Sequence, residues 1–409
     1  MGSADISGGS YVIFEHALHL MNRGWEVTIV TLTPVSEITN RWHPALDRLH
    51  FSTFENVAGT RFDLAVATWW KTVYELEHID ANQYCYFVQS IESWFYPDED
   101  AAVRNLVNST YLLPLPGITE ARWIRAHLET QFGRHFHLAA NGCRKDLYNE
   151  TGPAVSARVD GRLRVLVEGQ LGVDFKNVAR TIDLVRRSKA DEIWLLTISP
   201  IERYPGVDRV FSRLPVSECP AVYRSCDVLV KLSYVEGMFG PPLEMFHCGG
   251  TAIVYDVTGH DEYIVSGDNA LVVAIGDEAA AVAAIDQLKA DPALLAGLSR
   301  GARKTAALWP DWEESSSRFE QALRTILAEP QVSRERIGVM TREFFRQYVR
   351  AERALNNYRN RTARHRIASV VKRLAGTAAA RFPAAERAMR AWRASRLESS
   401  EKPRPRSRI

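Results

Sequence analysis

The sequence predicts an α/β protein with two Rossmann-like domains that face each other across a cleft, followed by a basic helical tail. Short apolar runs alternate with stretches of helical periodicity in both halves of the chain. Glycine-rich turns follow several of these runs, and Thr151-Gly152-Pro153 separates the two halves. We therefore predict domains over residues 1–150 and 151–330 and a tail over residues 331–409.

Composition limits the class of protein. The chain has 409 residues, enough for two domains and a tail. Its five cysteines are an odd number without a C-x-x-C pair, which argues against a disulfide framework or structural zinc and for a reducing cytoplasm. The sequence shows no apolar run of transmembrane length and no secretory signal pattern, so we expect a cytoplasmic protein.

The charge is unevenly distributed. Residues 331–409 contain 21 basic and 6 acidic side chains, whereas the remaining chain contains 30 basic and 43 acidic ones. The tail combines this charge with helical periodicity, which fits either a solvated helix or one that lies on an anionic membrane surface. A third alternative, binding of the tail to nucleic acid, is the least favoured, because the body of the chain has no recognition motif for it.

The first half begins with an incomplete unit. Ser7 to Ser10 predict a glycine turn, after which come a helix closed by Gly24 and a strand over Trp25–Leu32. Met1–Ile6 is too short and polar to be the strand that should precede such a turn. We therefore expect that a first strand is missing, because of either a late start or a fragment.

Two further strands are predicted over Leu64–Thr68 and Tyr84–Gln89. The second runs into the polar and aromatic loop Ser90–Pro97, which either packs in the core or faces a ligand at the carboxyl end of the sheet. Residues Gly117–Gly133 predict a helix with Thr119 as its cap.

The second half repeats the alternation of strands and helices. Strands are predicted over Leu163–Glu168, Ile193–Ile198 and Val228–Leu232. The loop Gly169–Lys176 precedes a predicted helix over Asn177–Arg187, so Lys176 and the backbone amides near Gly172 suit a diphosphate.

The most informative stretch is Ser233–Tyr263. A glycine turn, Glu236-Gly237-Met238-Phe239-Gly240, follows a buried strand and leads through two prolines into a helix. Glu236 and Glu244 flank this turn with seven residues between them. Free amides at the start of the helix, together with the carboxylates, predict a site for an anion or for sugar hydroxyls.

As a set, E-G-x-F-G-P-P-L-E, C-G-G-T and D-x-x-G-x-x-E resemble the signature of the retaining GT-B glycosyltransferases with a Glu-x7-Glu pair, the glycosyl transferases group 1. The resemblance implies a nucleotide-diphospho-sugar as donor, a metal-independent reaction and no cofactor. It places Glu236 and Lys176 at the reacting centre. It assigns donor binding to a further set: Glu244, Gly237, Met238, Phe239, Gly240 and Gly172.

The resemblance also implies that residues 1–150 form the acceptor-binding domain. The residues that it places near the acceptor or the donor sugar are Gly8, Gly9, Gln89 and Glu92. The loop after Gln89 is similar to that of a rhamnosyltransferase-like branch. The helix that starts near Trp309 returns to the first domain. The acceptor is expected to be a glycan or a lipid-linked sugar in bacterial surface glycan assembly, which would give the basic tail a reason to meet the inner face of the membrane.

One position departs from the family pattern. Gln170 stands where an arginine is usual, and Arg203 or Lys231 are the candidates to compensate. Together with the missing strand, this departure keeps open a second hypothesis, an inactive GT-B scaffold or binding protein. A sugar-nucleotide epimerase is a third hypothesis, and a phosphorylase is weaker because no lysine is evident for a pyridoxal cofactor.

Overall fold

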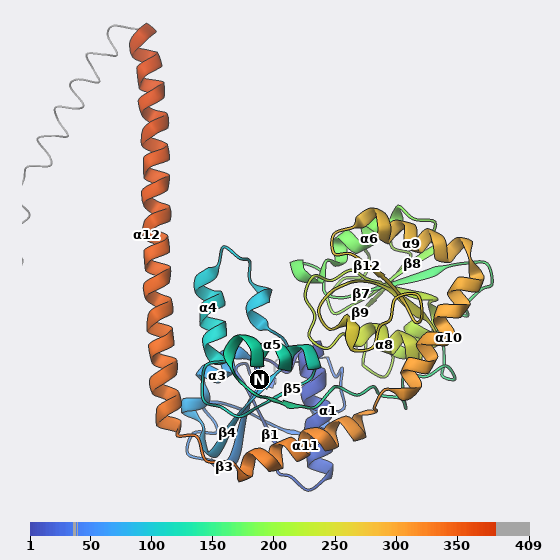
Figure 1. The fold of residues 1–409 in the computed structure, drawn as a ribbon, viewed down its shortest axis with the longest axis horizontal. Coiled ribbons are helices and arrows are strands. Elements are labelled where there is room, and N and C mark those ends of the chain that lie inside the picture. The colour runs from blue at the N-terminus through green and yellow to red at the C-terminus, as the bar shows by residue number, and fades with distance from the viewer. Residues whose placement is uncertain (36–37, 39, 382–409) are drawn as a thin grey trace, which may run out of the picture. The chain divides into compact units, whose positions relative to one another are not determined.

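The computed structural model describes residues 1–35, 38 and 40–381, with side chains as far as residue 358. The chain divides into a compact unit of residues 1–344 and a second unit that begins at residue 345. The compact unit contains two Rossmann-like halves with parallel sheets, which Figure 1 shows as blue to cyan and green to orange ribbons.

The second half is built on a six-stranded parallel sheet in the order β12-β11-β10-β7-β8-β9. The strands are β7 (Arg164–Glu168), β8 (Glu192–Thr197), β9 (Arg209–Ser212), β10 (Val228–Lys231), β11 (Thr251–Tyr255) and β12 (Leu271–Val273). Chain order reverses between the neighbours β7 and β10. In a doubly wound sheet, ligands bind in the crevice beside the carboxyl ends of the strands at such a reversal.

Helices cover both faces of this sheet (Figure 1). One face packs on α6 (Val178–Arg186) and α9 (Glu278–Ala290), and the other on α7 (Cys219–Ser225) and α8 (Gly240–His247). Helix α10 (Pro292–Leu308) contributes to the apolar clusters on both faces, with Leu298 in the first and Ala302 in the second. Val165 and Val167 point into one core and Leu166 into the other. A strand buried on both faces needs apolar residues at every position, which explains the continuous apolar runs in the sequence.

The first half has a four-stranded parallel sheet of β3 (Arg61–Ala67), β4 (Asp80–Val88), β5 (Gly117–Thr119) and β6 (His137–Leu138) in that order. A separate parallel pair consists of β1 (Thr28–Thr31) and β2 (His50–Thr53). The helices are α1 (Gly8–Asn22), α2 (Ala45–Arg48), α3 (Trp70–Tyr74), α4 (Ala101–Thr110) and α5 (Arg122–Phe132).

Helix α11 (Trp312–Ala328) returns from the second half and packs against α1 and the four-stranded sheet. Its Phe319 lies in one apolar cluster with Phe87 of β4 and Val12 of α1. The predicted return helix therefore forms and connects the second half to the core of the first.

Two local predictions were wrong. Gly117–Thr119 is a strand rather than the start of a helix, because Ile118 is fully buried beside Phe87 of β4. Helix α5 begins only at Arg122, after Ala121, so Thr119 is not its cap. Gly8 and Gly9 are also not a turn: they open α1, where the Ser7 hydroxyl accepts a hydrogen bond from the Ser10 amide at 3.0 Å.

The strands β1 and β3 lie in separate sheets, although both border one apolar cavity of about 200 Å³. Met1 already sits beside β1 in the manner of a parallel strand. Its ammonium group donates to the Val30 carbonyl at 2.7 Å, and its carbonyl accepts from the Leu32 amide at 3.3 Å. Met1 and the cavity thus lie on the side of β1 that faces β3.

The tail forms the helix α12 (Arg334–Arg381), as the helical periodicity predicts. The proline- and arginine-rich end of the chain lies outside the described residues.

Candidate functional site

A cavity of about 800 Å³ lies between the two halves, at the carboxyl ends of both sheets. It is lined by ten of the twelve residues predicted for the site: Gly8, Gly9, Gln89, Glu92, Lys176, Glu236, Gly237, Met238, Gly240 and Glu244. Residues from the first and second halves, far apart in the sequence, thus meet in one cleft.

Four charged side chains form a cluster in this cleft. The Lys176 ammonium lies 2.7 Å from Oε2 of Glu236, and the Lys231 ammonium lies 2.6 Å from Oε2 of Glu168 and 3.6 Å from Oε1 of Glu236. Glu168 ends β7 and Lys231 ends β10, so the strand reversal itself brings them together. Lys176 reaches the same point from the turn that precedes α6.

Electrostatics favours the charged forms of Glu236 and Lys231. Burial alone would raise the pKa of Glu236, but the charges of Lys176 and Lys231 outweigh it and hold this pKa below its usual value. Burial opposes the charge of Lys231 as well, yet Glu168 and Glu236 raise its pKa. Of the two lysines, Lys176 is the more accessible, with 29% of its side chain exposed against 3% for Lys231.

Several buried polar atoms in the cleft have no hydrogen-bond partner in the described part of the chain. These atoms are Oε1 of Glu236, Oγ of Ser90 and Oδ1 of Asn141. Buried polar groups are almost always hydrogen-bonded. Three unpaired oxygens around one cavity therefore indicate a place for a ligand that supplies hydroxyl or amide donors.

Glu244 lies on α8 at another part of the cavity, and its environment differs from that of Glu236. Burial raises its pKa to about 7, although hydrogen bonds from Tyr223 and Tyr148 act in the opposite direction. Glu244 is therefore a weaker acid than Glu236.

Two helices begin at the cavity. Gly8 and Gly9 open α1, and Gly240 and Pro241 open α8. The first amides of a helix have no partner within the helix and favour a negative charge. At α1 the amides of Gly8 and Gly9 suit the phosphates of a nucleotide. The first turn of α8 offers no such amide, because Pro241 and Pro242 have no N–H and the Gly240 amide donates to the Met238 carbonyl at 3.0 Å.

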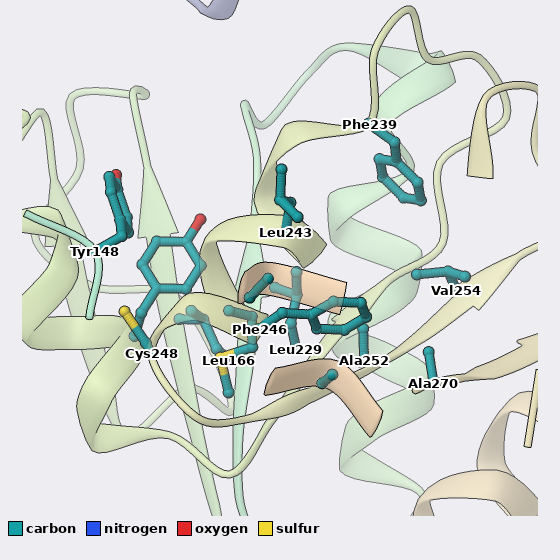
Figure 2. Packing of buried hydrophobic residues seen from close by; sticks show 14 of the residues in the cluster. Tyr148, Leu166, Leu229, Phe239, Leu243, Phe246, Cys248, Ala252, Val254 and Ala270 are labelled. Atoms are coloured by element: carbon teal, nitrogen blue, oxygen red, sulfur yellow. The ribbon is translucent and has the colours of Figure 1, made fainter. Parts of the chain in front are cut away.

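Two of the predicted site residues, Phe239 and Gly172, do not line the cavity. The Phe239 side chain is fully buried and does not line the cavity; Figure 2 shows its ring with Leu243, Phe246 and Val254 in the packed core. Gly172 is exposed but also lies outside the cavity lining, which is formed instead by Gly169 and Gln170.

Glu92 lines the cavity, but its carboxylate has structural partners. Oε2 accepts hydrogen bonds from the Trp70 amide at 2.8 Å and the Tyr86 hydroxyl at 3.1 Å. Burial raises its pKa to about 8. These contacts connect the loop to α3 and β4, and they leave Gln89 as the more accessible of the two predicted polar side chains.

The structure also distinguishes the two candidates to compensate for Gln170. Lys231 lines the cavity, and its ammonium lies 3.7 Å from the place where a side chain on Gly169 would begin. Arg203 is exposed and does not line the cavity. The second cation of the cleft is therefore Lys231, on β10.

Sequence reasoning missed Glu120 and Asn141, which line the cleft from the first half, and Glu168. Glu168 was included in a strand without a role, although its position as the last residue of β7 was the available signal. Glu120 follows β5, and it was missed because this strand was taken for part of a helix.

Within the described ranges, no group of three or more His, Cys, Asp and Glu side chains could hold a metal ion. No helix in the same part of the chain is long and apolar enough to cross a membrane.

Comparisons with known proteins agree with this geometry. Residues 205–305, which include the Glu236–Glu244 turn, match the family model "Glycosyl transferases group 1". O-antigen biosynthesis protein RfbC of Myxococcus xanthus is 27% identical over 222 residues. The match covers 51% of this chain but only 17% of that protein.

Two solved structures show a similar fold. Sucrose-phosphate synthase from Thermosynechococcus elongatus has a TM-score of 0.60 at 17% identity, over 79% of this chain and 94% of that one. Anabaena HepE in complex with UDP and glucose has a TM-score of 0.63 at 14% identity, over 80% and 98%. The fold is thus that of the GT-B glycosyltransferases. The segment from 205 to 305 is where the sequence itself matches glycosyl transferases group 1.

Proposed function

We propose that the protein is a glycosyltransferase that moves a sugar from a nucleotide-diphospho-sugar to a glycan or lipid-linked acceptor. The observation that supports this most is Oε1 of Glu236, a buried carboxylate oxygen that accepts no hydrogen bond, although the Lys231 ammonium lies 3.6 Å away and Lys176 binds the other oxygen. An ionised carboxylate in that position is ready to accept hydrogen bonds from sugar hydroxyls, while the exposed face of Lys176 is available to a diphosphate.

The proposed roles follow from the positions in the cleft. Lys176 meets the charge that develops on the departing diphosphate. Glu236 with the Gly237–Gly240 turn holds the transferred sugar, and Glu244 accepts the ribose hydroxyls. Gly8, Gly9 and Gln89 line the opposite wall, where the acceptor enters.

The reaction that this arrangement supports retains the anomeric configuration. The bond from the anomeric carbon to the diphosphate breaks, and the acceptor oxygen forms its bond on the face that the diphosphate leaves. The acceptor proton passes to the departing phosphate oxygen, so no covalent enzyme intermediate and no metal ion is required.

We propose UDP as the first nucleotide to test, because the HepE structures contain UDP, glucose or UDP-glucose. The name of the RfbC protein supports an acceptor in surface polysaccharide assembly. The basic tail would then place the enzyme at an anionic membrane surface where lipid-linked acceptors are made.

A thermal-shift screen with UDP, dTDP, GDP and ADP tests the donor site. A nucleotide at about 100 times its dissociation constant stabilises the protein by about 2.7 kcal/mol. We expect one nucleotide to raise the melting temperature of the wild type and of Glu202→Ala, a control at an exposed glutamate, but not of Glu244→Ala. If no nucleotide stabilises a protein that melts cooperatively, the scaffold hypothesis is favoured instead.

A further inference from the structure

One peptide bond of the glycine turn is held at both of its polar ends by side chains from the other half of the protein. Trp123 of α5 donates its indole N–H to the Gly237 carbonyl at 2.9 Å. Oε1 of Glu120 accepts from the Met238 amide at 3.1 Å. The C=O and the N–H of the Gly237–Met238 peptide are therefore both paired across the cleft.

Two glycines make this close approach possible. A side chain on Gly237 would begin 2.1 Å from the Gln89 carbonyl and 3.0 Å from Oε1 of Glu120. One on Gly259, which has a φ of +84°, would begin 2.5 Å from the Gly237 carbonyl and 2.8 Å from the Trp123 indole nitrogen. Any larger residue at either position would separate the peptide from its partners.

The side chains of Glu120 and Trp123 are themselves held in place by other contacts. Glu120 is 5% exposed, and its other carboxylate oxygen accepts from the Asn141 amide at 2.9 Å. The Trp123 ring stacks on Trp94 at 5.5 Å, and its backbone amide donates to Glu262 at 2.9 Å. Side chains held on both sides impose one geometry on the peptide rather than follow it.

We propose that Glu120 and Trp123 are positioning residues that put the Gly237–Met238 turn into its sugar-binding form only when the two halves of the cleft are together. This inference rests on the proposed function, because the turn adjoins Glu236, which is assigned to the transferred sugar. Glu244, assigned to the nucleotide, makes no contact with either residue. These two contacts would couple closure of the cleft to binding of the sugar and leave binding of the nucleotide unchanged.

Hydrogen exchange of the peptide fragment that contains Met238 tests the two hydrogen bonds made by Glu120 and Trp123 without any ligand. We expect the Met238 amide to exchange at least ten-fold faster in Glu120→Ala and Trp123→Phe than in the wild type, on the scale of one lost hydrogen bond. Glu120→Gln retains an acceptor and should restore slow exchange. Trp25→Phe, which removes an indole hydrogen bond to Glu320 away from the cleft, should leave this exchange unchanged.

Calorimetric titration with UDP and with UDP-glucose tests the consequence for binding. We expect Trp123→Phe to weaken UDP-glucose about ten-fold and to change the affinity for UDP by less than two-fold. An equal loss of affinity for both compounds would overturn the inference. Unchanged exchange of the Met238 amide in both Glu120→Ala and Trp123→Phe would overturn it as well. A wild type that binds neither compound would count against the proposed function. The exchange experiment would still decide whether Glu120 and Trp123 hold the Gly237–Met238 peptide.

Discussion

Replacement of Lys176 by methionine tests the charge cluster most sharply. The variant keeps the length of the side chain and removes its charge. Glu236, with 6% of its side chain exposed, then loses a partner at 2.7 Å and retains Lys231 at 3.6 Å. A hydrogen bond to a charged group contributes about 1.5–3 kcal/mol, so we expect Lys176→Met to lower the free energy of unfolding by about that amount at pH 7.

The loss should depend on pH in a defined direction. The pKa of Glu236 in the folded protein lies below its usual value of 4.5, so the pair stabilises the fold fully above pH 4.5. This contribution disappears as the pH falls through the folded pKa and Glu236 takes up a proton. Urea denaturation of the wild type and the variant should therefore differ most near neutral pH and converge in acid.

The same substitution should affect turnover more strongly than stability. Removal of one group that stabilises transition-state charge typically lowers kcat by about 10²–10³. Conversion of the nucleotide-sugar can be followed by chromatography of the released nucleotide, with Lys304→Met as a control at an exposed lysine. Wild-type turnover in Lys176→Met, with a protein that folds normally, would refute the role of this lysine at the diphosphate.

Three further substitutions or additions have defined outcomes. Glu244→Gln should stabilise the free protein above pH 7 by up to about 3 kcal/mol, because the shift of its pKa from 4.5 to about 7 makes ionisation costly in the folded state, while nucleotide affinity measured by calorimetry should fall. Unchanged affinity would remove Glu244 from the donor site. Lys231→Met leaves Glu168 and Glu236 without their shared cation and should cost about 3–5 kcal/mol in urea denaturation; a loss below about 1 kcal/mol, the scale of a surface ion pair, would show that the cluster is not cooperative. An apolar strand of five residues fused ahead of Met1 should raise the melting temperature by pairing with β1 and β3, and a glycine-serine extension of equal length should not; equal effects would contradict strand addition at the cavity.

Local sequence patterns were sufficient for the central turn. Glu236 and Glu244 are fixed relative to each other by one turn and one helix start, so their spacing in the sequence carries the geometry. The apolar runs of the second half likewise identified its core strands, because burial on both faces requires apolar residues at every position.

The partners of that turn could not be read in the same way. Glu120, Glu168 and Lys231 stand at the carboxyl ends of three different strands, and the strand order and the packing of the two halves bring them to one cleft. Phe239 was assigned to the donor through the backbone amides of the Gly237–Gly240 turn; its side chain packs in the core, so only its backbone remains for that role. The strand β5 has three residues, too few for an alternating pattern to show.

The crystal structure of the protein with bound UDP would test the central claim most directly. We predict that the nucleotide lies in the 800 Å³ cleft, with its ribose hydroxyls on Glu244 and its diphosphate within hydrogen-bond distance of Lys176. A nucleotide bound elsewhere on the protein, or an empty cleft at a UDP concentration that saturates binding in solution, would contradict the assignment of this cleft as the donor site.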